Sequence, residues 1–169
     1  MESKYQIEFD KEIPKVLFDN KLSLIFSTYQ AGRLMIIGSS DGVNLLQIPI
    51  PFKKPMGIAI SGENMAIAGF DEICFFAGNT NVAKSLKNNE KIDQAFVFRG
   101  AYNTSFLDIH DISYGNKEIW GVNTLFSCIC TFDVTHNFVP KWKPSFITEL
   151  VPEDRCHLNG LAMLNGKPK

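Results

Sequence analysis

The segment Asp108–Phe132 reads DIHDISYGNKEIWGVNTLFSCICTF, and the rest of the chain is organised around it. An apolar strand pattern starts with the polar pair His110 and Asp111, breaks at Gly115–Lys117, and resumes as a second strand that ends at Asn123. A third strand follows directly. Buried strands rarely carry His, Asp or Asn unless those groups are paired or used. The segment therefore predicts an antiparallel sheet and, beside it, a candidate site.

The same outline occurs before and after this segment. Gly57–Ile60, Asp111–Tyr114 and Gly160–Met163 each read a small or polar residue, an aliphatic, a small residue and a large apolar one; their starts lie 54 and 49 residues apart. Three or four short strands per repeat at this spacing are typical of a β-propeller blade. A two-layer antiparallel sandwich is the alternative. The common internal order of the repeats favours the propeller.

We therefore predict an all-β fold, with residues 1–169 forming a single propeller-type domain. Its predicted parts are an extension at 1–21 with a short helix near 12–19, blades at 22–52, 55–99 and 108–150, and a partial blade at 156–169. The strong hairpin turn Asn165-Gly166 precedes only three residues, so no partner strand is expected after it. Three blades and one strand do not close a ring. We expect further blades of a longer chain, or a second chain, to complete it.

Composition excludes some classes of function. The chain has a net charge of -1, which does not provide the clustered basic face of a nucleic-acid-binding protein. No apolar run approaches the roughly 20 residues of a membrane span, and the first residues lack the layout of a secretory signal. We predict a cytoplasmic protein that binds neither nucleic acid nor membrane, and whose four cysteines are thiols.

Three longer motifs resemble an uncharacterised bacterial family known only as a conserved hypothetical protein with a domain of unknown function. They are Phe26–Leu34 (FSTYQAGRL), Trp120–Cys128 (WGVNTLFSC) and Glu153–Ala162 (EDRCHLNGLA). The resemblance spans about residues 12–166. Members of that family are longer, which implies that this chain is its N-terminal part. The resemblance implies no reaction, because the family has none assigned.

Polar residues at the starts of the inner strands of a propeller collect at one mouth of its central channel. The repeat places two such groups in adjacent blades, with further candidates close by in the sequence. The candidates are His110, Asp111, Asn123, Asp154, Arg155, His157 and Asn159.

Three interpretations of these residues stay open. They cap turns and pair with each other, as polar residues at strand ends usually do. Alternatively, they bind a small polar ligand, such as a sugar or a peptide end, or a protein partner, and the module has no catalytic role. The third interpretation is a lactonase-like hydrolase in which a divalent metal ion is the cofactor and is held by Asp111, Asn123 and Asn159. His110 or His157 would then transfer the proton.

A zinc site is a separate possibility. Cys128 and Cys130 lie two apart on one strand and so share a face, and Cys156 and His157 add two further ligand types. The spacing matches no standard zinc pattern. The alternative is that these cysteines are small buried apolar residues of the core.

Overall fold

The computed structural model describes residues 8–86 and 92–169, and the chain divides into two compact units, residues 1–55 and 56–169. In the described residues every strand pairing is antiparallel and only two short helices accompany the strands, which confirms the predicted all-β class. The prediction of one propeller-type domain over the whole chain stays a prediction, and each unit is described by itself.

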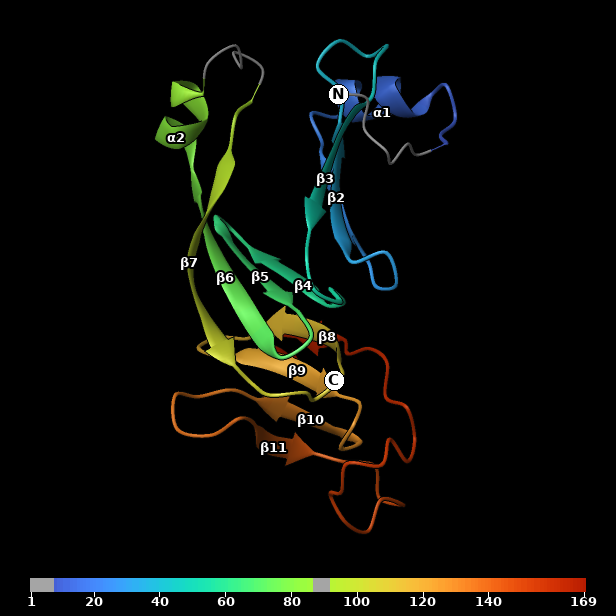
Figure 1. The fold of residues 1–169 in the computed structure, drawn as a ribbon, viewed down its shortest axis with the longest axis vertical. Helices are drawn as coiled ribbons and strands as arrows, with labels where there is room; N and C mark the ends of the chain where they lie inside the picture. The colour runs from blue at the N-terminus through green and yellow to red at the C-terminus, as the bar shows by residue number, and fades with distance from the viewer. Residues whose placement is uncertain (1–7, 87–91) are drawn as a thin grey trace. The chain divides into compact units, whose positions relative to one another are not determined.

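The first unit is a helix followed by a three-stranded meander (Figure 1). Its elements are α1 (Ile13–Asp19), β1 (Leu24–Thr28), β2 (Arg33–Gly38) and β3 (Leu46–Pro51), with sheet order β1-β2-β3. The helix matches its prediction: Pro14 occupies its first turn, where a missing N–H costs nothing, and Leu17 is buried.

The sequence predicts a third strand from Val43 to Ile50, but β3 starts only at Leu46. The Asp41 carboxylate accepts hydrogen bonds from the backbone N–H groups of Val43 and Asn44, at 2.9 and 2.8 Å, and so extends the turn. Two prolines were predicted to end this strand: Pro49 lies within it, whereas Pro51 is its last residue. An edge strand tolerates them because its outer N–H groups have no partner strand.

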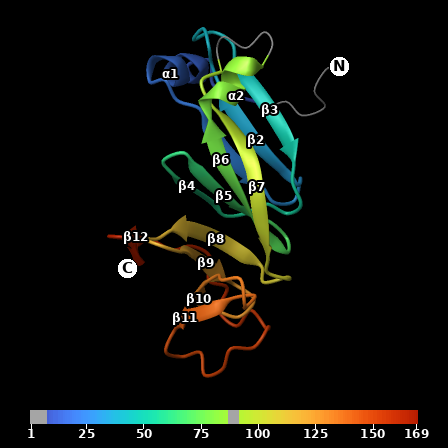
Figure 2. The ribbon, with the colours of Figure 1, turned by 90° about the vertical axis from the view of Figure 1, so that its left-hand side faces the viewer.

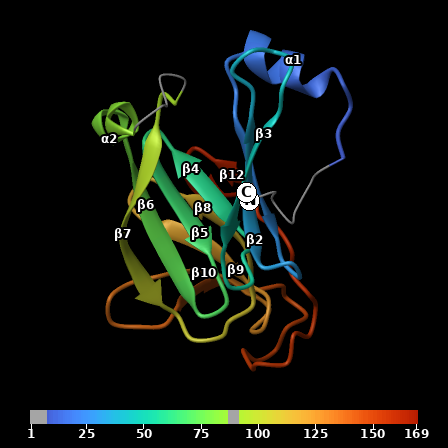
Figure 3. The ribbon, with the colours of Figure 1, turned by 45° about the horizontal axis from the view of Figure 1, so that its top comes forward.

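The second unit begins with a four-stranded sheet of order β4-β5-β6-β7 (Figure 3). Its strands are β4 (Ile58–Ser61), β5 (Asn64–Ala68), β6 (Glu72–Asn79) and β7 (Ala95–Asn103). β6 and β7 continue past β4 and β5, and α2 (Thr80–Ser85) follows β6 at their far end (Figure 1). The polar sequence 78–93 predicts a solvated loop, or an excursion with a short helix near 82–86, and α2 agrees with that helix. Residues 87–91 of this stretch lie outside the described residues.

The segment Asp108–Phe132 and the residues that follow it form the second four-stranded sheet. Its strands are β8 (Ile109–Tyr114), β9 (Ile119–Asn123), β10 (Cys128–Thr131) and β11 (Val139–Trp142), in the order β11-β10-β9-β8. The three strands predicted for this segment are confirmed. Their alternation of apolar and polar residues and the Gly115-Asn116 turn are local signals, and the tertiary structure leaves them unchanged.

The two four-stranded sheets pack face to face (Figure 2). Ala59, Ala66 and Ile73 from the first sheet share one hydrophobic core with Ile112 and Cys130 from the second. Full burial of an aliphatic side chain such as Ile73 stabilises the folded state by about 1.5–3 kcal/mol. Small residues on the first sheet bring the two backbones close together, and this packing holds β8 and its polar residues in place.

The last part of the chain differs from its prediction. The strand expected from Cys156 is wrong: residues 156–162 form no strand, and β12 comprises only Met163–Leu164. The expectation that the Asn165-Gly166 turn has no partner strand is also wrong, because β13 (Lys167–Pro168) pairs with β12. Asn165 and Gly166 have φ values of 53° and 75°, as the tight hairpin requires.

The hairpin docks on the turn between β8 and β9. The Asn116 side-chain amide donates to the carbonyl oxygen of Asn165 at 3.3 Å. A Cβ on Gly115 would lie 3.0 Å from the carbonyl oxygen of Gly166.

In the described part of the chain, no helix has the length and hydropathy needed to cross a bilayer.

Candidate functional site

A β-bulge in β8 sets the direction of His110. In the ladder with β9, Ile109 pairs with Asn123 and Asp111 pairs with Val122, so His110 is the extra residue. A bulge bends its strand and re-aims a side chain, and bulges are common next to functional sites. The His110 Nδ1–H donates to the carbonyl oxygen of Asp108 at 3.0 Å, and the side chain is 10% exposed. The ring is therefore held rigidly at the edge of the sheet.

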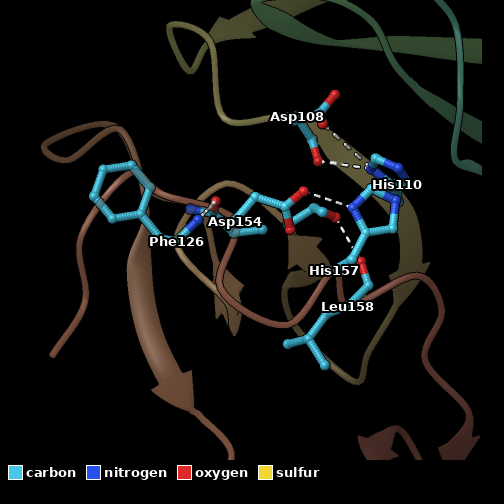
Figure 4. A network of polar contacts seen from close by, with 8 residues as sticks. Asp108, His110, Phe126, Asp154, His157 and Leu158 are labelled. Carbon is cyan, nitrogen blue, oxygen red and sulfur yellow. Dashed lines mark hydrogen bonds and ion pairs between the residues drawn. The ribbon is translucent and has the colours of Figure 1, made fainter. Parts of the chain in front are cut away.

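His157 reaches the same place from the loop that follows β11. Its Nδ1 lies 2.6 Å from the Asp154 Oδ2 atom, and its side chain is 56% exposed. The two imidazole rings meet edge to face, with centroids 4.9 Å apart (Figure 4). We call His110 and His157 the imidazole pair. Two of the predicted candidates, 47 positions apart in the sequence, thus come together.

The partners of the two rings fix which nitrogen carries the proton. A backbone carbonyl oxygen and an ionised carboxylate oxygen can only accept, so each Nδ1 must donate. In a neutral ring the Nε2 atom then carries a lone pair. Among the described residues neither Nε2 has a hydrogen-bond partner. The pair therefore offers two oriented nitrogen atoms for external chemistry.

The backbone around the imidazole pair is strained. Asp108, Asp154 and His157 have φ values of 51°, 48° and 45°, in the left-handed region that side chains other than glycine seldom adopt. Such conformations cost of order 1–3 kcal/mol each and concentrate at functional sites. Asp and His tolerate this region better than most residues. Three of the four residues at the site adopt it, which supports a functional reading.

Several hydrogen bonds hold the loop of His157 in place. The Asp154 N–H donates to the Leu125 carbonyl oxygen at 2.9 Å, and the Thr124 hydroxyl donates to the Leu158 carbonyl oxygen at 2.6 Å (Figure 4). The Asp111 Oδ2 atom accepts from the Leu161 N–H at 3.0 Å. The loop is thus attached to β8 and to the turn after β9. Asp111 acts here as a structural clamp, as the first of the three interpretations expects.

Among the described residues, no hydrogen bond or ion pair joins the other predicted site residues to the imidazole pair. Asn123 is fully buried, and its Oδ1 atom accepts from the Phe126 N–H at 3.1 Å, so it caps the turn. Arg155 pairs with Glu153 at 2.8 Å. Asn159 is exposed. Sequence reasoning missed Asp108 as a site residue, although its position two residues before His110 on the same strand edge was an available signal.

The geometry gives little support to the predicted metal sites. Among residues 8–86 and 92–169, no three His, Cys, Asp or Glu side chains lie close enough together to hold a metal ion. Cys128 and Cys130 are fully buried in the core between the two sheets, and the hydrogen bond with Cys128 and burial both raise the pKa of Cys130. These thiols behave as small core residues.

The electrostatics of the site predict a pH effect. The hydrogen bond to Asp154, with a smaller contribution from the charge of Asp108, raises the pKa of His157 above its ordinary value of 6.5. Protonated His157, paired with Asp154, therefore stabilises the folded state. This contribution is fully present below pH 6.5 and is lost as the pH rises through the folded-state pKa of His157.

We expect NMR titration of the His157 ring protons to give a pKa above 6.5, and Asp154→Asn to lower it towards that value. Asp133→Asn, which removes the carboxylate beside His136, is the matched control and should leave the pKa of His157 unchanged. Equal His157 pKa values in wild type and Asp154→Asn would contradict the assigned pairing.

The fold and the site together define an all-β protein of packed antiparallel sheets with a His–Asp cluster at the edge of one sheet. The chain belongs to the family described as a domain of unknown function (DUF4915), whose match covers residues 11–169. This confirms the resemblance to an uncharacterised family. No curated protein and no solved structure is significantly similar to the chain.

Proposed function

We propose that the sheets of the second unit are blades of a propeller. The repeat-equivalent positions Gly57, Asp111 and Gly160 support this, because they follow one another in space. A Cβ on Gly57 would lie 2.9 Å from the Asp111 Cα atom, and a Cβ on Gly160 would lie 3.7 Å from the Asp111 Oδ2 atom. Successive inner strands around a common axis give this series of contacts. Further blades, from a longer chain or a second chain, then complete the ring.

On this scaffold the chain acts as a ligand-binding module, and the imidazole pair is its site. One observation carries the proposal: both Nδ1 atoms are held by oxygen atoms of the protein, while both Nε2 atoms lack a partner among the described residues. A binding site needs polar groups whose orientation is fixed before the ligand arrives.

The ligand is a small polyhydroxyl molecule of the sugar type. Below its raised pKa, His157 is protonated and its Nε2–H donates, whereas an imidazole ring in its neutral form presents an Nε2 lone pair that accepts. A hydroxyl group is both donor and acceptor and so satisfies either ring. The strained backbone at Asp108, Asp154 and His157 fits a site shaped before binding.

The test is a titration of the protein with a panel of monosaccharides, followed by two-dimensional NMR. At least one sugar should shift the ring signals of His110 and His157. His110→Ala or His157→Ala should weaken the binding of that sugar about three- to tenfold, which corresponds to the loss of one hydrogen bond. Lys141→Ala, a substitution at an exposed position of β11, should leave the affinity for the sugar unchanged. The proposal fails if no sugar shifts these signals, or if the histidine variants bind as the wild type does.

The Asp154–His157 pair favours a second candidate, a hydrolase. A carboxylate that orients an imidazole is the arrangement of general acid–base catalysis. The same samples distinguish this candidate from a binding module. The hydrolase is favoured over the binding module if the protein hydrolyses a lactone or ester probe and His157→Ala loses this activity. For the metal-dependent hydrolase, an added divalent ion should also stimulate the hydrolysis.

A further inference from the structure

A second concave site lies in the second unit. It is a groove of about 530 Å³ between the end of β7 and the turn that joins β8 to β9, a size typical of small-ligand sites. No residue of the imidazole pair lines it. The groove is lined by the aromatic residues Phe75, Tyr102 and Tyr114 and by the charged residues Arg99, Lys117 and Glu118, among others.

A second β-bulge leaves this space open. In the pairing of β6 with β7 the register shifts between Phe75 and Phe76, where Gly100 lies opposite Phe75. A Cβ on Gly100 would meet no atom within 4 Å, so side chains of the protein do not fill the wall there. Bulges of this kind are specified by the sequence and often border sites. The groove is thus a feature of the sheet's register and not a gap in its packing.

Aromatic side chains form the interior of the groove. The rings of Phe75 and Tyr102 meet edge to face with centroids 5.2 Å apart, which holds both in position. Burial raises the pKa of Tyr114, so its hydroxyl stays protonated at neutral pH and can donate a hydrogen bond. Fixed rings beside a donating hydroxyl favour a flat apolar body that also carries a hydrogen-bond acceptor.

The charges on the groove fix the sign of the ligand. Arg99 and Lys117 contribute two positive charges, and Glu118 contributes one negative charge. Neither cation has a hydrogen bond or an ion pair with another residue in the described ranges. A surplus of one positive charge beside aromatic rings matches a ligand with one negative group.

We propose that this groove binds a small aromatic monocarboxylate. The ring of the ligand contacts Phe75 and Tyr102, and its carboxylate lies between Arg99 and Lys117. The site goes beyond the proposed sugar site, because none of its residues takes part in that one. A protein with both sites binds two chemically different small molecules in one unit.

The probe is 2-naphthoate, titrated by calorimetry and compared with 2-naphthylmethylamine, which has the same ring system and the opposite charge. The protein should bind the carboxylate and not the amine. Arg99→Ala and Lys117→Ala should each weaken the binding of 2-naphthoate about two- to fivefold, the range for an exposed charge pair. Lys141→Ala is the matched control for the loss of one lysine, and should leave binding unchanged.

The aromatic contact has its own test. Tyr102→Phe keeps the ring and should retain most of the affinity, whereas Tyr102→Ala should reduce it at least tenfold. Tyr102 packs against the core, so the thermal melting of Tyr102→Ala is measured first. If this variant is unfolded, the charge variants decide the matter. His157→Ala should bind 2-naphthoate as the wild type does, so failure of the sugar site leaves this result intact. The proposal is overturned if the protein does not bind 2-naphthoate or binds 2-naphthylmethylamine equally well. It is also overturned if Lys141→Ala loses as much affinity for 2-naphthoate as the Arg99 and Lys117 variants do.

Discussion

Replacing Gly57 by alanine is expected to lower the free energy of unfolding by about 3 kcal/mol, the upper part of the range for overpacking. The new Cβ would lie 2.7 Å from the Ile112 nitrogen and 2.9 Å from the Asp111 Cα and carbonyl carbon atoms. All three are backbone atoms and cannot rotate away. The two four-stranded sheets must therefore separate at their closest point, which loosens the core that they share.

Gly160→Ala is the matched control, because Gly160 holds the equivalent position in the next repeat. Its Cβ would lie 3.7 Å from the Asp111 Oδ2 atom, an ordinary contact distance. Urea unfolding of both variants, with linear extrapolation to water, measures the difference. Similar free energies of unfolding for the two variants would contradict the close approach of the sheets at Gly57.

The second large effect is expected at Asp111. Its Oδ1 atom accepts from the Ile112 N–H at 2.9 Å and its Oδ2 atom from the Leu161 N–H at 3.0 Å. Asp111→Ala removes both acceptors at once, and each unsatisfied amide costs about 1–3 kcal/mol when water cannot replace the acceptor. Because Asp111 is only partly buried, we expect a total loss of about 2–3 kcal/mol.

Hydrogen exchange at the amide of Leu161 gives a local measure of the same effect. The amide should exchange faster in Asp111→Ala, and at an intermediate rate in Asp111→Asn, which retains one acceptor oxygen. Asp133→Ala is the control: that carboxylate also accepts from two backbone amides, at 2.8 and 2.7 Å, but in an exposed turn. An equal loss of stability in Asp133→Ala and Asp111→Ala would contradict a clamp between repeats.

These two residues also show how far the sequence predicted the fold. The repeat alignment of Gly57, Asp111 and Gly160 placed them in equivalent positions, and the structure brings them into successive contact. The alignment could not say that one position must be glycine for close packing while another carries a carboxylate clamp. That distinction depends on distances between different sheets, which no local pattern encodes.

The predictions that failed lie where tertiary contacts replace strand pairing. The apolar pattern from Cys156 predicted a strand, but the Leu161 amide bonds the Asp111 carboxylate and no neighbouring strand. Residues 156–162 consequently form a loop held by side chains. Similarly, the Asp41 carboxylate accepts hydrogen bonds from the amides of Val43 and Asn44, so β3 begins only at Leu46. In both places an Asp side chain competes with the sheet for backbone amides.

The sequence predicted the residue types of the candidate site and the convergence of some of them, but not which side chains touch. His110, His157 and Asp154 were all among the candidates, because polar residues at apolar strand ends are conspicuous in any sequence. Asn123 was also a candidate, yet it is fully buried and caps a turn. The bulge that turns His110 gives no sequence signal, because it appears only when β8 is paired with β9.

The sequence by itself determined the all-β class, the order of the strands and the position of tight turns such as Asn165-Gly166. These follow from side-chain alternation and from residues that tolerate positive φ, which are properties of a few neighbouring residues. Only the tertiary structure decided that, among the candidates predicted to converge, the rings of His110 and His157 touch. Their meeting depends on Thr124 binding the carbonyl of Leu158, 34 residues further along the chain, and on one extra residue in β8.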